Sequence, residues 1–377
     1  MDCRRVALIA VAATLGCGVR PVALPWAGDA RLVVVGDVVL PALNAPGRPR
    51  TDVGGLSGAY YDAGRNRLYA VADDRERPRV LGFDLSVAPV MRLVLRELVV
   101  LQSPPGQRRT LDAEGLAPAP NGNWFVSSEG DPAALAQPVA GIHEYTRDGR
   151  FVRSLPLPRA YLGVVGDDSA GMRLNLALET LSVSPDRTRL FAALESSLLQ
   201  DGPVGDFERG AVVRILVYDL RNLATPPREY AYRADPMPRP AAWAAADGDA
   251  GVVDVLALSN VDLLVLERGY VVEAGASPPR RENTIRIYRV RLDRAAEITG
   301  RASLTRDPPG AVLEKRPVLD LSTMAPDLQE RLRGLENFEA LTFGPRLPDG
   351  SSTLLVLSDD NFSPGQVTAL IAFRWAR

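Results

Sequence analysis

A β-hairpin pattern that recurs five times constrains the fold of this chain more than any other feature of its sequence. In the last copy, over residues 336–361 (ENFEALTFGPRLPDGSSTLLVLSDDN), acids open the pattern, two short apolar runs flank a Pro/Asp/Gly turn, and further acids close it. The four upstream copies begin at Gly54, Asp112, Ala177 and Val252. The copies start roughly 55 to 85 residues apart, and β-hairpins repeated in this way indicate a propeller or a β-solenoid.

The segments between the hairpins contain apolar runs that can supply the outer strands of each repeat. We therefore predict an all-β chain, a β-propeller of five to six four-stranded blades. The outer strands are expected at residues 79–85, 91–99, 141–145, 151–157, 212–220, 228–232, 284–292 and 317–321. A sixth blade stays open because residues 236–251 and 273–282 are long enough to contain irregular strands.

Three further segments have weaker patterns. Residues 325–335 predict a short helix within a loop, since acids come early and an arginine and a glycine come late. The Gly-, Pro- and Asp-rich tracts 201–209 and 236–251 predict surface loops near one mouth of the propeller.

The two ends of the predicted domain each contain an apolar strand without a nearby hairpin partner, at residues 31–40 and 367–375. Pairing of these strands would close the ring and cover two open sheet edges. We therefore predict one propeller domain over residues 31–377. The composition, 46% hydrophobic and 24% charged, is that of a globular chain.

The first 19 residues resemble an export signal, because Arg4 and Arg5 precede an apolar run that is too short to span a membrane. Residues 1–30 are thus predicted to be a signal peptide and spacer, and the mature protein to be periplasmic or extracellular. Cys17 follows Leu15 and Gly16, where a lipid anchor is an alternative. Both cysteines, Cys3 and Cys17, lie in this leader, so we expect no disulfide in the mature fold.

The charge balance narrows the class of partner. The net charge is −2 and no basic excess is present, which argues against nucleic-acid binding. We expect a monomer without a membrane span that acts on a small anionic or ester substrate.

Each hairpin pairs an early polar residue with a late acid, and in a propeller the innermost strands line the channel. The early residues predict a ring made of Ser57, Glu114, Glu179, Asp254 and Glu339. The late acids Asp73, Asp74, Glu129, Glu195, Glu267, Asp359 and Asp360 are expected near the same mouth. Convergent carboxylates repel one another, and a bound cation or raised pKa values relieve that repulsion. Oxygen ligands favour Ca²⁺, or Mg²⁺, over zinc; the alternative is that these acids are solvated caps at strand ends.

The scarcity of histidine and the absence of several known motifs exclude some classes of active site. His143 is the only histidine, so metal centres built on several His ligands and two-step histidine phosphatases are excluded. No G-x-S-x-G, Walker or dinucleotide-binding glycine motif is present.

The hairpin motifs resemble the phytase-like family described as having esterase-like activity of phytase. The resemblance rests on GLSGAYYD at Gly55, DAEGLA at Asp112, ETLSVSPD at Glu179, LERG at Leu266, and NFEALTFGP with LSDDNF near the end. It implies an exported β-propeller with hydrolytic activity on phosphate or carboxylic esters. The chain departs from the family pattern at Thr180 and Ala340, where a glycine more usually follows the glutamate.

Two function classes follow from these observations. The first is a metal-dependent ester hydrolase in which bound Ca²⁺ neutralises the substrate and a carboxylate activates water. Its catalytic residues would be Glu114, Glu179 and Glu339, its substrate-binding residues Arg75, Arg268 and Ser57, and its metal ligands Glu129, Glu195, Glu267, Asp359 and Asp360. The second is a non-catalytic propeller that binds a ligand or a protein at the same acidic mouth.

Overall fold

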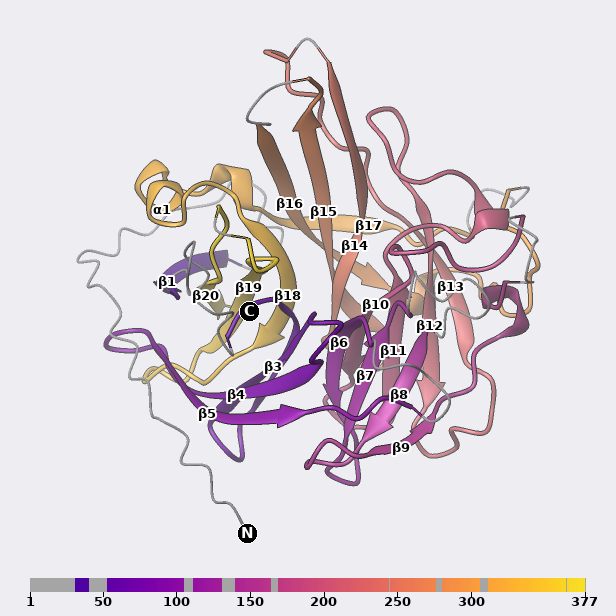
Figure 1. The fold of residues 1–377 in the computed structure, drawn as a ribbon, viewed down its shortest axis with the longest axis horizontal. Coiled ribbons are helices and arrows are strands. Elements are labelled where there is room, and N and C mark those ends of the chain that lie inside the picture. Colours follow the sequence, from indigo (N-terminus) through magenta and orange to yellow (C-terminus); the bar gives the residue numbers. More distant parts are fainter. Residues whose placement is uncertain are drawn as a thin grey trace.

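The computed structural model describes residues 31–40, 53–104, 111–130, 140–163, 169–243, 245–275, 280–305, 311–363 and 365–376. These residues form five four-stranded antiparallel sheets arranged around a central axis (Figure 1). The predicted all-β propeller of four-stranded blades is thereby confirmed, and the described part of the chain contains five blades. The predicted leader and Cys17 lie outside the described residues.

In the first four blades the strands run from the axis outward in chain order. The first blade contains β2 (Leu56–Asp62), β3 (Arg67–Ala72), β4 (Arg79–Ser86) and β5 (Arg92–Val100), and the second β6 (Ala113–Pro118), β7 (Trp124–Ser128), β8 (Gly141–Tyr145) and β9 (Phe151–Ser154). The third contains β10 (Leu178–Val183), β11 (Arg189–Leu194), β12 (Val212–Asp219) and β13 (Arg228–Arg233). The fourth contains β14 (Ala246–Ala257), β15 (Asp262–Glu273), β16 (Arg281–Arg291) and β17 (Lys315–Asp320).

The fifth blade joins the two ends of the domain. It consists of β18 (Asn337–Phe343), β19 (Ser352–Asp359), β20 (Ala369–Ala376) and, outermost, β1 (Arg31–Val39). Strand β1 runs antiparallel to β20, with Leu32 opposite Trp375 and Val38 opposite Leu370. Leu32 and Val38 are buried, so β1 both covers the edge of β20 and contributes to the core.

Helical structure is short. The predicted loop helix is present as α1 (Pro326–Arg331), beside the fifth blade, and single 3₁₀ turns occur at Arg159–Tyr161, Leu199–Asp201, Leu292–Arg294 and Leu321–Thr323 (Figure 1). Within the described ranges no helix has the length and apolar character needed to cross a membrane.

The fourth blade extends further than the others at one end. Residues 246–251, predicted as loop, form the first half of β14 and pair with residues 268–273 of β15. Their glycines and aspartates suggest a loop, but Met237 and Trp243 pack on Ala250 and Val271 and stabilise the extended strands. Strands β14, β15 and β16 project from the body there (Figure 1). The tract therefore lengthens the fourth blade and does not build a sixth.

Candidate functional site

The innermost strand of every blade has a β-bulge close to the channel. The register shifts between Leu56 and Ala59, Ala113 and Leu116, Leu178 and Thr180, Val252 and Asp254, and Phe338 and Ala340. A bulge re-aims a side chain and bends its strand. The first residues of the bulges, which we name the inner positions, are Ser57, Glu114, Glu179, Val253 and Glu339.

A second set of equivalent positions lies on the neighbouring strand of each blade. The residues paired just before the bulges are Ala72, Ser128, Leu194, Glu267 and Ser358. The residues that follow them, named the second positions, are Asp73, Glu129, Glu195, Arg268 and Asp359. Four blades thus contribute an acid at the second position, and the fourth blade contributes an arginine.

In the fourth blade the strand register differs by one residue from the match between hairpins that the sequence predicted. Sequence comparison equated Asp254 with Glu339, but the strand register equates Val253 with Glu339. Because side chains alternate along a strand, a shift of one residue turns the side chain to the other face. Asp254 accepts hydrogen bonds from the amides of Val255 (2.8 Å) and Leu341 (2.6 Å), and so joins the fourth blade to the fifth.

The same shift applies to Glu267. Its carboxylate accepts hydrogen bonds from the Tyr232 hydroxyl, from the Lys315 ammonium at 2.6 Å and from the Asp235 amide at 2.9 Å. These contacts lie between the third and fourth blades. The structure therefore does not bring this predicted metal ligand to the channel.

Asp74 and Asp360, the second acids of two predicted pairs, also have structural partners. Asp360 accepts hydrogen bonds from the amides of Gly55 (2.8 Å) and Phe362 (3.0 Å), and holds the first blade against the fifth. Asp74 pairs with the buried Arg79 at 2.7 Å. Both carboxylates therefore help to hold the loops around the channel.

The remaining acids converge. Carboxylate oxygens of Asp73, Asp112 and Glu114 lie within 4.8 Å of one another, and so do those of Glu114, Glu129 and Glu179. Glu114 belongs to both groups. We name as the acidic cluster the carboxyl groups of Asp73, Asp112, Glu114, Glu129, Glu179, Glu195, Glu339 and Asp359, which influence one another electrostatically; Asp249 and Asp360 add negative charge at its edge.

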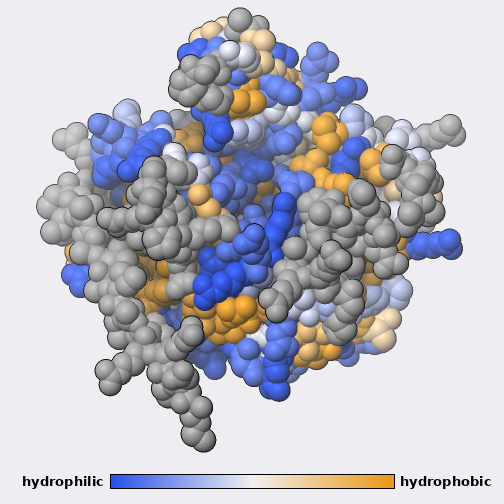
Figure 2. Space-filling model, viewed as in Figure 1, coloured by the Kyte–Doolittle hydropathy of each residue, from blue (hydrophilic) through white to orange (hydrophobic). Residues whose placement is uncertain are grey.

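Asp112 was not among the sequence-predicted site residues, although it opens the DAEG motif two positions before Glu114. Its carboxylate is buried, and it forms a bidentate ion pair with Arg75 at 2.7 and 2.5 Å. The signal available in the sequence was its i, i+2 spacing from Glu114, which puts two residues on one face of a strand. Hydrophilic residues gather around the middle of the face shown in Figure 2.

Burial raises the pKa values of Asp73, Glu114, Glu129, Glu179, Glu195, Glu339 and Asp359. Burial, followed by the charges of Asp73 and Glu129, raises the pKa of Glu114 well above its ordinary value. Burial and then the charge of Glu114 do the same to the pKa of Glu179. The pKa of Asp73 rises to about 8, through burial and then Asp112. Such carboxyls either hold a proton near neutral pH or require a nearby positive charge.

Two guanidinium groups balance part of this charge. The Arg75 side chain is 41% exposed, and besides Asp112 it donates to Asn175 at 2.6 Å. The Arg268 side chain is 15% exposed; it donates to Glu195 at 2.9 Å, to Glu339, and to Asn337 at 2.6 Å. Asn337 also donates to Glu339 at 2.9 Å. Asn175 and Asn337 are thus further members of the site that sequence reasoning missed.

Ser57 takes the inner position of the first blade, between the glutamates of the second and fifth blades. It is 3% exposed, and its Oγ has no hydrogen-bond partner among the described residues. A buried hydroxyl without a partner is costly, so a water, an ion or a ligand is expected beside Ser57 Oγ.

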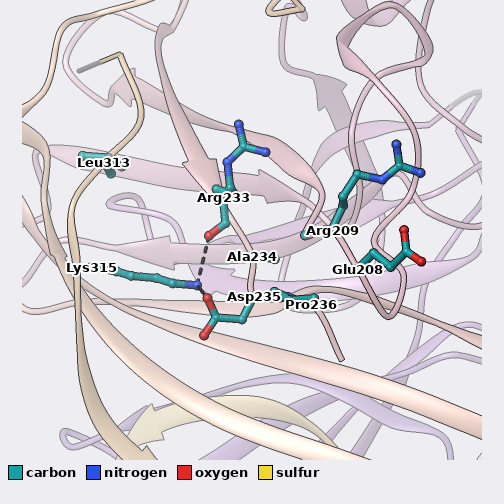
Figure 3. Close-up of a pocket in the computed structure, with 9 residues that line it drawn as sticks. Glu208, Arg209, Arg233, Ala234, Asp235, Pro236, Leu313 and Lys315 are labelled. Carbon is teal, nitrogen blue, oxygen red and sulfur yellow. Dashed lines mark hydrogen bonds and ion pairs between the residues drawn. The ribbon is translucent and has the colours of Figure 1, made fainter. Parts of the chain in front are cut away.

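A separate cavity of about 360 Å³ lies at the outer side of the third and fourth blades (Figure 3). Its lining includes Arg209, Arg233, Glu208 and Leu313, and the Lys315 ammonium lies 2.7 Å from Asp235 at its edge. Lys315 also forms an ion pair with Glu267, which therefore helps to hold Lys315 at the edge of this cavity. Its lining contains none of the acidic cluster.

The chain is similar to a known protein family and, over part of its length, to a curated protein. A family model described as "Phytase-like: Esterase-like activity of phytase" matches residues 51–362. A curated protein of Arthroderma benhamiae named "Uncharacterized secreted protein" is 27% identical over 138 residues, which is 30% of this chain and 25% of that protein. The chain thus aligns with about a quarter of that relative's length.

Solved structures of low sequence identity align over most of the chain. The PQQ-bound aldose sugar dehydrogenase of Streptomyces coelicolor is 13% identical, with a TM-score of 0.35 and 98% of both chains covered. The endo-arabinase of Bacteroides thetaiotaomicron is 7% identical, with a TM-score of 0.45, 89% of this chain and 96% of that chain being covered. At these values neither likeness supports a statement about function.

Proposed function

This chain belongs to the phytase-like family described by the esterase-like activity of phytase, and from that premise we propose that it is a divalent-metal-dependent hydrolase of phosphate or carboxylic esters. The observation that carries the proposal is the acidic cluster, in which Glu114 joins two groups of carboxylates spaced to share a cation. The unpartnered Ser57 hydroxyl beside it is a second, independent indication of a ligand.

The donor set fits Ca²⁺, with Mg²⁺ as the alternative. Every group in the cluster offers oxygen, and carboxylate oxygens are the usual ligands of these two ions. The residues that would hold the cation are Glu114 and Glu129 on one side and Asp73 and Asp112 on the other, with Glu179 within reach of the same ion. Glu195 and Asp359, which were also predicted as ligands, occupy the second positions of the third and fifth blades.

The bound cation would neutralise the ester's developing negative charge and polarise its reacting bond. Glu114 and Glu179 have no guanidinium contact among the described residues, whereas Glu339 is held by Arg268 and Asn337. A carboxylate acting as base must be within reach of a water and free of a permanent partner. We therefore propose that Glu179 is the general base and that Glu114 is a ligand of the cation. Glu339 positions the Arg268 side chain.

The substrate's anionic group would meet the guanidinium groups at the mouth. Arg75 is the more exposed of the two, and its bidentate grip on Asp112 fixes its plane. A planar guanidinium matches the geometry of phosphate and carboxylate oxygens. Ser57 Oγ would donate to the same ligand.

We also propose that the protein is exported. The leader pattern of residues 1–19 and the description of the Arthroderma benhamiae relative as secreted support this. Cell fractionation tests it: the chain should be found outside the cytoplasm and lack its leader, and full-length chain in the cytosol would contradict the proposal.

The activity is tested with a panel of phosphate and carboxylic esters in calcium, in magnesium and in chelator. We expect hydrolysis of at least one ester class that is lost in chelator and restored by the cation. Glu179→Gln should abolish turnover while cation binding persists, and Glu273→Gln, in an exposed ion pair with Arg280, is the matched control. Turnover that is unchanged in chelator would refute the metal-dependent mechanism.

One observation favours a second function, a non-catalytic binding propeller. Both guanidinium groups of the site are already bound to carboxylates, so neither is free to take a substrate anion without exchanging its partner. In that case the cation would stabilise the fold and a partner would bind at the mouth. Cation uptake without turnover on any ester of the panel would support this alternative.

A further inference from the structure

The fivefold arrangement is broken at the fourth blade. Its inner position is Val253, where three other blades place a glutamate, and its second position is Arg268, where the other four place an acid. At these two positions the fourth blade therefore contributes one positive charge and no carboxylate.

The contacts of Arg268 divide the acidic cluster into two sides. One of its nitrogens donates to Glu195 of the third blade, and another donates to Glu339 and Asn337 of the fifth. Asp249, at the projecting end of β14, adds a further negative charge near Arg268. On the other side, Glu114, Glu129 and Glu179 approach one another without a guanidinium contact among the described residues.

We propose that the Arg268 guanidinium takes the place of one divalent cation, so that metal binds only on the side of the channel formed by the first three blades. This inference rests on the proposed cation binding of the acidic cluster. Glu195 and Glu339 are then neutralised by the protein itself, and the metal site consists of the carboxylates that share Glu114.

The physical reason is charge complementarity in a site shielded from water. Two carboxylates bound to one guanidinium have little remaining attraction for a cation, and the guanidinium would repel a divalent ion placed between them. Removal of Arg268 leaves Glu195, Glu339 and the adjacent Asp359 as an uncompensated group of buried acids. A group of this kind binds a cation or takes up protons.

The test is the number of calcium ions bound per chain, measured by equilibrium dialysis and by calorimetric titration at pH 7.5. Arg268→Gln should bind one more calcium ion than the wild type. Arg268→Lys keeps the charge and should keep the wild-type number, and so should the control Arg280→Gln, whose ion pair with Glu273 is exposed. Adding Glu339→Gln to Arg268→Gln should remove the extra site.

Equal numbers in the wild type and in folded Arg268→Gln would overturn the inference while leaving the proposed function intact. A wild type that binds no divalent cation would overturn both. If Arg268→Gln does not fold in chelator, refolding in calcium is the second readout: recovery supports the inference, and failure to recover in calcium overturns it.

Discussion

Two glutamates of equal chemistry should respond in opposite ways to loss of their charge. Glu114 lies among other carboxylates and belongs to both three-acid groups, whereas Glu339 is bound to Arg268 and Asn337. We therefore expect Glu114→Gln to stabilise the protein in chelator and Glu339→Gln to destabilise it. Gln keeps the size of the side chain, so the comparison isolates the charge.

The magnitudes follow from the geometry. Two carboxylates whose oxygens lie within 4.8 Å of one another repel by about 3–4 kcal/mol or more at an effective dielectric constant of about 20. Proton uptake already relieves part of this, so Glu114→Gln should gain about 1–3 kcal/mol. Glu339→Gln should lose about 1–3 kcal/mol, because a hydrogen bond to a charged group becomes a weaker one. For 377 residues, either change moves the melting temperature by about 1–4 °C.

Scanning calorimetry in chelator measures both shifts, and calcium titration of the same variants measures affinity. Glu114→Gln should weaken calcium binding by about 1–3 kcal/mol, or roughly 5- to 150-fold. If both variants shift the melting temperature in the same direction, or if Glu114→Gln binds calcium as the wild type does, the reasoning from the acidic cluster is refuted.

Three further predictions concern pH and stability. In chelator the unfolding free energy should fall from about pH 4 to pH 8, because Asp73 (pKa about 8) and Glu195 (pKa about 7) keep protons in the folded state that the unfolded chain releases near pH 4. Calcium should flatten this pH profile, and a profile that is already flat in chelator would contradict the prediction. Arg214→Met should cost about 3–5 kcal/mol in urea unfolding, since it leaves the buried Asp201 and Glu229 without their partner; a loss below about 1 kcal/mol would refute this. Deleting residues 1–42 removes β1 and should give insoluble or unfolded protein in a solubility and melting assay, whereas deleting residues 1–28 should not; unchanged melting of the longer deletion would contradict the role of β1 in closing the ring.

The sequence was sufficient to predict the propeller because each hairpin has two short apolar runs around a turn of its own. The same repetition placed Glu114, Glu179 and Glu339 at equivalent positions, and the structure brings these three together with Glu129, Glu195 and Asp359. It also singled out Arg75 and Arg268, whose partners only the three-dimensional structure identifies.

The remaining site residues depended on information that the pattern does not contain. In the fourth hairpin an acid is adjacent in sequence to each of the two equivalent positions, Val253 and Arg268. The sequence comparison therefore selected Asp254 and Glu267, each one residue away from the correct position. Only the strand register assigns the inner position to Val253, which packs in the hydrophobic core between the fourth and fifth blades. The strand over residues 246–251 was missed because its stability comes from Met237 and Trp243, which pack on it from outside the strand.

The most direct test of the central claim, that the acidic cluster is a divalent-cation centre, is a crystal structure grown or soaked in manganese, with anomalous scattering recorded to locate the ion. The account predicts an anomalous peak bound to the Glu114 carboxylate and to at least one of Glu129, Glu179, Asp73 and Asp112. A well-ordered channel at millimolar manganese with no anomalous peak among these carboxylates would contradict it.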